Sequence, residues 1–284
     1  MKKENPLISI IIPTRNRYEF IRLLIGDLRQ QDFTDFEIIV VDQSDKVEKL
    51  EGCHQIVSNT LGPCVSRNLG VKNAKGNILV FLDDDGRVYG DFVREITTSI
   101  INNEYSIVIG AVCSPKGDYL RSEGSYLKAK NENFIKVLTS SPYASMSRIC
   151  MAFSAGCGAI KKEIFNEIGG FDESFDPTGA GEDRDMALKL FLAGHVTWYN
   201  AKAKLLHAVA SKGGSRGLGS RSLMLDIHTF KMAKKYFSDV LAHELKCTIL
   251  RKYKKNFLGA IKKGRGIRTQ YRALKKIRTY LKEV

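Results

Sequence analysis

Apolar and polar positions in the first third of the chain follow two alternating periodicities. Three continuous apolar runs, Leu7–Ile12, Phe36–Val41 and Ile78–Leu82, have the length and composition of buried parallel strands. Between them, Phe20–Leu28 spaces its apolar residues as one face of a helix does, and a second helix is expected over Val65–Asn73. This β-α-β-α-β rhythm predicts a doubly wound, mostly parallel α/β sheet flanked by helices.

The second half of the chain has a less regular pattern. Residues 114–150 are mixed and predict no clear element, whereas the small residues of Phe153–Ile160 permit close backbone approach. The other expected elements are a strand at Tyr105–Val112, helices at Lys162–Ile168 and Glu182–Ala193, two short strands at Trp198–Tyr199 and Leu205–His207, a Gly-, Ser- and Arg-rich loop at Lys212–Ser222, and a helical segment from Leu223 onward with a break at Lys263–Gly266.

Polar side chains follow each of the three buried strands at the point where the strand ends. Thr14 and Arg15 follow the first, Asp42 follows the second, and an aspartate triplet follows the third. Ligands of open α/β sheets bind beyond the carboxyl ends of the strands. We therefore expect these side chains to face one crevice.

The aspartate triplet, Asp83-Asp84-Asp85, is the most informative local feature. Because side chains alternate along a strand, Asp83 and Asp85 should point to one side and Asp84 to the other. Two like charges a few Å apart repel by about 4 kcal/mol at an effective dielectric constant of ~20. A divalent cation with a preference for oxygen ligands, Mg²⁺ or Mn²⁺, would relieve that repulsion. The alternative is a solvated acidic cluster at a strand-to-turn boundary.

Composition and motifs exclude several classes of protein. At 284 residues with 43% hydrophobic content, the chain can form one large domain or two small ones. Neither a Gly-x-Gly-x-x-Gly nor a Gly-x4-Gly-Lys-Ser/Thr motif occurs, which disfavours a dinucleotide-binding Rossmann domain and a P-loop NTPase. The six cysteines form no Cys-x-x-Cys pair and lie at no zinc-finger spacing from a histidine, so we expect free thiols in a reducing compartment.

The net charge of +14 belongs to the C-terminal part of the chain. Residues 231–284 hold 17 Lys and Arg and three acidic residues, whereas residues 1–230 are balanced. Their apolar residues fall at helical intervals between the basic clusters, a pattern typical of a membrane-surface helix. The alternative is a pair of helices packed on the body with a solvated basic face. Binding to nucleic acid is not expected, because aromatic residues are sparse between the basic clusters and no known motif occurs.

The expected location is cytoplasmic, or peripheral at the inner face of the plasma membrane. The apolar run Leu7–Ile12 is too short for a signal sequence and ends at Pro13. No stretch approaches the roughly 20 apolar residues of a membrane span.

The ordered motifs together resemble the inverting family 2 glycosyltransferases, which have the GT-A fold. The resemblance covers about residues 7–210. It rests on IIIPTRNR, IIVVDQSD, GPCVSRNLG, ILVFLDDDG, FSAGCGAIKKEIF, GGFDESF and GAGEDRDMAL. It implies a nucleotide-sugar-binding half at residues 1–113, an acceptor-binding and catalytic half at 114–222, and a basic amphipathic helical segment at 223–284.

The resemblance assigns the nucleotide to the ends of the first two strands and to the following helix. Asp42 would accept the N–H of a pyrimidine ring, although it can alternatively cap the backbone of its own turn. Here the chain has Gln43-Ser44 where the family commonly has a second acidic residue or Asn, followed by Gly-Ser. The other residues assigned to base, ribose or nucleotide sugar are Pro13, Thr14, Arg15, Arg67 and Asn68. For Arg67 and Asn68 the alternative is an exposed helix arginine with an ordinary polar neighbour.

The resemblance also gives roles to the triplet. Asp83 would contact the ribose, Asp85 would bind the metal that bridges the diphosphate, and Asp84 would support the metal shell. His207, after the last short strand, matches a position that some family members use as a further metal ligand. The alternative for His207 is an ordinary core or surface histidine.

A pair of acidic residues opens the helix at Glu182. In the family the matching pair supplies the base that deprotonates the acceptor, and Asp183 matches the base itself. A carboxylate at a helix N-terminus is favoured by the helix dipole and stays ionised. Glu182 and Asp183 can alternatively serve only as helix caps.

Two further groups complete the implied site. Gly156 and Cys157 would line the sugar pocket. Lys212 and Arg216 would fold over the diphosphate when the donor binds; the alternative is a solvated loop.

The function implied is metal-dependent, inverting transfer of a hexosyl or deoxyhexosyl group from a nucleoside-diphosphate sugar to a glycan or lipid-linked acceptor, as in bacterial polysaccharide biosynthesis. One alternative is a catalytically silent protein that binds nucleotide sugars or acts as a membrane scaffold. A nucleotidyltransferase is the weaker alternative. That class normally has a Gly-rich loop and a lysine after the first strand, and this chain has Pro13-Thr14-Arg15-Asn16 there.

Overall fold

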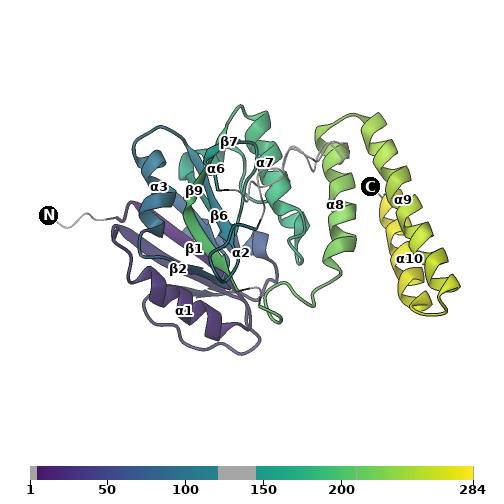
Figure 1. Ribbon diagram of the computed structural model, residues 1–284, viewed down its shortest axis with the longest axis horizontal. Coiled ribbons are helices and arrows are strands. Elements are labelled where there is room, and N and C mark those ends of the chain that lie inside the picture. The colour runs from purple at the N-terminus through teal and green to yellow at the C-terminus, as the bar shows by residue number, and fades with distance from the viewer. Residues whose placement is uncertain (1–4, 121–144, 209, 284) are drawn as a thin grey trace. The chain divides into compact units, whose positions relative to one another are not determined.

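A computed structural model describes residues 5–120, 145–208 and 210–283 of the chain, and these form two compact units, residues 1–218 and 219–284. The first unit is built on a nine-stranded sheet with the order β3-β2-β1-β4-β8-β6-β9-β5, and β7 pairs with β9. Its strands are β1 (Ile8–Thr14), β2 (Phe36–Asp42), β3 (His54–Val57), β4 (Ile78–Leu82), β5 (Gly86–Val88), β6 (Ile107–Cys113), β7 (Arg148–Cys150), β8 (Cys157–Lys161) and β9 (Thr197–His207). Figure 1 labels five of these strands, β1, β2, β6, β7 and β9.

The first four strands in the sheet order are parallel, and three of them, β1, β2 and β4, are the apolar runs from which parallel strands were predicted. β1 pairs in parallel with β2 on one side and with β4 on the other. β8 then runs antiparallel to both β4 and β6, and β5 runs antiparallel to β9. The sheet is therefore mixed but mostly parallel, and the predicted α/β class is confirmed.

Helices cover both faces of this sheet. The helices of the first unit are α1 (Tyr18–Leu28), α2 (Pro63–Asn73), α3 (Phe92–Ile101), α6 (Lys162–Glu167) and α7 (Glu182–Leu192), with a 3-10 turn, η1, at Glu173–Phe175. The buried faces of α1 and α3 pack with one side of β1, β2 and β4 in a single core cluster. On the other face, the ring of Phe81 contacts Phe153, Phe165 and Phe171, with centroids 5.3–6.4 Å apart.

Two predictions about element boundaries were wrong. The expected short strands at Trp198–Tyr199 and Leu205–His207 are one continuous strand, β9, which stays paired with β6 across a register shift at Gly110/Ala111. The helical segment after Leu223 has a second break, at Phe237–Ser238, which the sequence pattern did not predict. There the Ser238 hydroxyl accepts a hydrogen bond from the backbone N–H of Leu241 and begins a new helix.

The second unit consists of three helices that pack against one another. They are α8 (Arg221–Tyr236), α9 (Asp239–Lys262) and α10 (Ile267–Glu283). Asp226 on α8 accepts hydrogen bonds from Lys252 and Tyr253 on α9, at 2.6 and 2.9 Å. None of the helices in the described parts of the chain has both the length and the apolar character needed to cross a bilayer.

Candidate active site

The aspartate triplet lies at the carboxyl end of β4, where backbone hydrogen bonds hold it from two sides. The N–H of Asp83 donates to the carbonyl of Gly156, and the carbonyl of Asp85 accepts from the N–H of Ala208 at 2.9 Å. Asp84 and Asp85 are each only 3% exposed. The triplet is therefore fixed between the starts of β8 and β5 and the end of β9.

Asp83, Asp85 and His207 converge on one point. Each offers one ligand atom, and these atoms all lie within 4.8 Å of one another. Nε2 of His207 lies 3.1 Å from Oδ1 of Asp85. The Asp85 carboxylate raises the pKa of His207 against the effect of burial. Burial opposes ionisation of Asp85, but His207, Arg17 and the N–H of Ala210 hold its pKa below the usual value.

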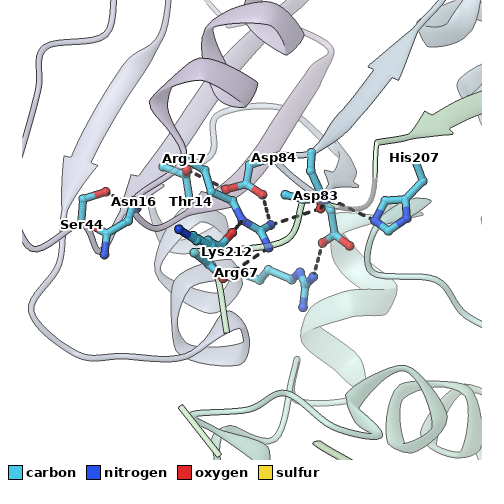
Figure 2. Close-up of polar contacts among 12 residues, drawn as sticks. Thr14, Asn16, Arg17, Ser44, Arg67, Asp83, Asp84, His207 and Lys212 are labelled. Atoms are coloured by element: carbon cyan, nitrogen blue, oxygen red, sulfur yellow. Dashed lines mark hydrogen bonds and ion pairs between the residues drawn. The ribbon is translucent and has the colours of Figure 1, made fainter. Parts of the chain in front are cut away.

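Asp84 points away from that cluster and makes a buried ion pair with Arg17. Nη1 of Arg17 lies 2.7 Å from Oδ1 of Asp84, and the Thr14 hydroxyl donates to Oδ2 at 2.8 Å (Figure 2). Burial raises the pKa of Asp84 to about 6, although Arg17 and Thr14 oppose the shift. The same Arg17 nitrogen lies 3.3 Å from Oδ2 of Asp85. Arg17 thus compensates two adjacent carboxylates.

Arg17 also holds the loop that follows β9. Its Nε donates to the carbonyl of Lys212 at 2.8 Å, and Nη2 donates to the carbonyl of Gly213 at 3.3 Å. Gly213 has φ +73°, and a Cβ at this position would lie 2.6 Å from Cγ of Arg17. A glycine is therefore required for the loop to approach Arg17 this closely.

Arg67 on α2 links the triplet to the start of α7. Its Nη2 donates to Oδ1 of Asp83 at 2.9 Å, and its Nη1 lies 3.6 Å from Oε1 of Glu182. Arg67 is 3% exposed. Burial lowers the pKa of its guanidinium, but Asp83, Glu182 and Asp183 together raise it above the usual value. The buried guanidinium of Arg67 therefore lies between the aspartate triplet and the acidic pair that opens α7.

The acidic pair begins α7 directly after a glycine with left-handed backbone. Gly181 has φ +99° at the N-cap position. Oδ1 of Asp183 accepts a hydrogen bond from the N–H of Ala155 at 2.7 Å, which joins α7 to the segment before β8. Glu182 is buried, whereas Asp183 is partly exposed.

The residues assigned to the nucleotide base have extensive contacts within the protein. The fully buried Asp42 carboxylate accepts hydrogen bonds from the Tyr18 hydroxyl, from Nε2 of Gln55 and from the N–H of Ser44. The contact with Ser44 is the turn-capping alternative considered for Asp42. Arg15 pairs with Asp45 at 3.0 Å, Pro13 is half-buried, and Thr14 is engaged by Asp84.

Three other assigned residues lie at the edge of this region or in the core. Both functional atoms of the Asn68 amide bond the backbone of Phe171, at 2.9 and 3.0 Å, which anchors the segment before η1. Gly156 packs so closely that a Cβ there would lie 2.5 Å from Oδ2 of Asp83. The Cys157 side chain is fully buried within the core cluster, and this position does not support its predicted place in a sugar pocket.

The loop cations Lys212 and Arg216 are both exposed. The backbone of Lys212 is fixed by Arg17, so its side chain projects from a held segment. Arg216 is close enough to His207 to lower the pKa of that imidazole, against the larger effect of Asp85.

Two residues that organise the site, Arg17 and Asp176, were not predicted from the sequence pattern. Arg17 belongs to the first quoted motif, but its pairing with Asp84 depends on a contact across 67 positions. Asp176 accepts hydrogen bonds from the N–H groups of Cys64 and Val65, at 3.0 and 2.8 Å, and so caps α2 from a distant segment. The available signal was Gly62 at the N-cap, which has no side chain to cap the helix itself.

The donor set at this edge of the sheet fits a divalent cation. Two carboxylates and one imidazole match Mn²⁺, and the carboxylates alone match Mg²⁺. Five carboxylates, from Asp83, Asp84, Asp85, Glu182 and Asp183, surround the guanidinium groups of Arg17 and Arg67. The excess of negative charge favours binding of a cation beside the triplet.

Comparison with known proteins identifies the family. A family model described as Glycosyl transferase family 2 matches residues 9–169. A Haemophilus influenzae protein described as an uncharacterized glycosyltransferase is 29% identical over 211 residues, covering 71% of this chain and 67% of that protein. The chain also matches TarS of Staphylococcus aureus, of which it spans 20%.

Solved structures show the same fold at low sequence identity. A TarS fragment, residues 1–349 of the S. aureus protein in complex with UDP-GlcNAc, superposes with a TM-score of 0.57 at 17% identity, covering 84% of this chain and 70% of the fragment. The mannosyltransferase PcManGT from Pyrobaculum calidifontis, in complex with GDP-Man and Mn²⁺, gives a TM-score of 0.56 at 17% identity, covering 98% and 86%. The fold of the first unit is therefore GT-A.

Proposed function

The chain belongs to glycosyl transferase family 2, and from this we propose that it moves a sugar from a nucleoside-diphosphate donor to a hydroxyl group of a glycan or lipid-linked acceptor, with inversion at the anomeric carbon. The observation that carries the proposal is the convergence of Asp83, Asp85 and His207 at the carboxyl end of a GT-A sheet. Arg67 also supports the proposal, because its guanidinium contacts both Asp83 and Glu182 and so links the proposed metal site to the acidic pair that opens α7.

In this proposal Asp183 is the general base. Its carboxylate takes the proton from the acceptor hydroxyl while the acceptor oxygen forms a bond to the anomeric carbon. The bond from that carbon to the diphosphate oxygen breaks, and the nucleoside diphosphate leaves with the electron pair. The hydrogen bond from Ala155 to Oδ1 orients the carboxylate. Proton transfer to a positioned base contributes about 10²–10⁴-fold to such a rate.

Asp85 and His207 are the proposed metal ligands, and Asp83 either joins them or contacts the ribose. A bound Mg²⁺ or Mn²⁺ supplies neutralising charge to the diphosphate leaving group. Arg67 holds Asp83 in place from the side of α2. Asp84 would support the metal ligands indirectly, because it holds Arg17 beside the carboxylate of Asp85.

The remaining assignments belong to the same proposal. Lys212 and Arg216 approach the diphosphate from a loop that Arg17 anchors. The donor-binding half is residues 1–113, the acceptor half 114–222 and the basic helical segment 223–284. The nucleotide contacts of Pro13, Thr14, Arg15, Asp42, Asn68 and the backbone at Gly156 complete the donor site.

A cytoplasmic location, where nucleotide sugars are available, and a role in polysaccharide biosynthesis follow from the proposed reaction.

The donor is proposed to be a UDP- or GDP-sugar, because the similar structures hold UDP-GlcNAc and GDP-Man. Calorimetric titration of UDP, GDP and dTDP in Mn²⁺, in Mg²⁺ and in chelator tests this. We expect one nucleotide to bind with a strong dependence on the divalent cation. Equal binding in chelator would remove the metal from the scheme. Nucleotide-sugar binding with neither transfer nor hydrolysis would indicate a silent binding protein.

A further inference from the structure

The hairpin of α9 and α10 carries a long stretch of positive charge between its few acidic residues, Asp239 and Glu244 near its start and Glu283 at its end. Residues 246–282 hold 14 Lys and Arg and no Asp or Glu. The two helices pack side by side within the second unit (Figure 1). A surface of this kind binds anions, and the arrangement of its apolar residues indicates which kind of anion.

Four large apolar side chains are exposed around the turn between these helices. Leu258 and Ile261 on α9 are 58% and 48% exposed, and Ile267 and Tyr271 on α10 are 39% and 54% exposed. The rings of Phe257 and Tyr271 contact each other with centroids 5.8 Å apart, so the two helices meet at this level. We call these four residues the apolar tip.

Apart from the contact of Tyr271 with Phe257, the apolar tip is separate from the residues that hold the unit together. Leu274, Ile277 and Leu281 of α10 are at most 6% exposed and form its buried face. Ile267 and Tyr271 lie on a different face, and the helical repeat continues this face through Lys275, Arg278 and Lys282. The exposure of the tip is thus not explained by packing within the unit.

The same face of α10 has a shallow cationic hollow beside the tip. The hollow has a volume of about 170 Å³ and is lined by Tyr271, Leu274, Lys275, Arg278, Thr279 and Lys282. The three cations there, Lys275, Arg278 and Lys282, are the charged donors that a phosphate group requires, whereas the Thr279 hydroxyl donates to the carbonyl of Lys275 at 3.3 Å. Its floor, Leu274, is apolar and buried.

We propose that the α9–α10 hairpin docks this chain on an anionic lipid bilayer. The apolar tip enters the boundary between headgroups and acyl chains, and lysines and arginines on either side contact lipid phosphates. The hollow on α10 receives the phosphate of one headgroup. Nucleic acid fits this surface less well, because three of the four exposed tip residues are aliphatic and offer neither stacking nor hydrogen bonds to bases.

This docking is independent of the proposed transfer reaction, since it needs neither donor nor acceptor. The test is co-flotation of the full chain with vesicles of phosphatidylcholine alone or with phosphatidylglycerol added. We expect binding to the anionic vesicles, release as salt is raised, and little binding to neutral vesicles. Equal binding to both compositions, or none to either, overturns the proposal. Tighter binding to duplex or single-stranded nucleic acid than to anionic vesicles, at the same salt, also overturns it.

Two sets of variants locate the contact. The hollow variant Lys275→Gln/Arg278→Gln/Lys282→Gln should weaken binding about fivefold per charge, on the order of 100-fold in total. The control Lys46→Gln/Lys72→Gln/Lys116→Gln removes the same charge from exposed positions of the first unit and should bind as the wild type does. An equal loss in the control would show a net-charge effect only and would overturn the assigned surface.

The tip variant Leu258→Ser/Ile261→Ser keeps every charge and should weaken binding about tenfold, because less apolar area enters the bilayer. Both positions are about half exposed, so the melting temperature should fall only a little. A second measurement does not depend on a loss of binding. The double variant Trp198→Phe/Tyr271→Trp has its single tryptophan at position 271, and brominated lipid should quench the fluorescence of that tryptophan. Unquenched fluorescence on bound vesicles overturns insertion of the tip.

Discussion

Nη1 of Arg17 lies 2.7 Å from the carboxylate of Asp84, and the two side chains are only 9% and 4% exposed. Neither residue of this ion pair is a proposed metal ligand, but the pair lies beside those ligands. Through its other nitrogens Arg17 also reaches the carbonyls of Lys212 and Gly213. One buried cation therefore joins the end of β1, the end of β4 and the loop after β9.

Replacing Arg17 tests how much the fold depends on this pair. Arg17→Met leaves the Asp84 carboxylate buried without its cation, and breaking a buried pair in this way costs about 3–5 kcal/mol. We expect the free energy of unfolding in urea to fall by that order. Asp84→Asn in the same background should restore part of it. Arg94→Met, which breaks an exposed pair with Asp32, is the control and should change stability little. An effect of Arg17→Met as small as that of the control would contradict the structural role of the pair.

Replacing Asp183 separates a catalytic base from a helix cap. Asp183→Asn should lower the transfer rate by about 10²–10⁴-fold and leave the affinity for nucleotide unchanged. Asp239→Asn removes a comparable acidic residue from the first turn of α9 and should leave the transfer rate unchanged. Rates are measured with saturating donor, and affinities by calorimetry. Near-normal turnover of Asp183→Asn would remove this residue from the proposed role.

Replacing His207 tests the metal site without any nucleotide. His207→Ala removes one of three converging ligand atoms, so the affinity for Mn²⁺ should fall by at least about tenfold. Electron paramagnetic resonance of free Mn²⁺ during titration measures this directly. His195→Ala is the control, because its imidazole pairs with Glu167 elsewhere on the first unit. Mn²⁺ binding that is the same in both variants would exclude His207 as a ligand.

Replacing Asp176 tests the capping of α2 from a distant segment. Asp176→Ala removes the acceptor for the N–H groups of Cys64 and Val65, and loss of a helix cap costs about 0.5–2 kcal/mol. We expect a lower midpoint of urea unfolding and a smaller effect for Asp176→Asn, which keeps one acceptor oxygen. Asp118→Ala, at an exposed turn, serves as the control. Equal midpoints for Asp176→Ala and Asp118→Ala would show that the cap contributes nothing.

The order of the first strands and helices could be predicted because each depends on a local repeat. The apolar runs at β1, β2 and β4 lie within a residue or two of their expected ends. The break between α8 and α9 was missed because it depends on one cap residue, Ser238, and not on a change in periodicity. The two expected strands near the end of the first unit merged into β9 because pairing with β6 continues through a bulge.

By itself the sequence determined that polar side chains would gather at one edge of the sheet, because parallel strands end on the same side and each apolar run is followed by polar residues. The tertiary structure alone decided how these side chains pair. Arg17 meets Asp84 across 67 positions, and Asp176 reaches Cys64 across 112. No local repeat encodes such a contact, because it depends on where separate elements are brought by the packing of the whole sheet.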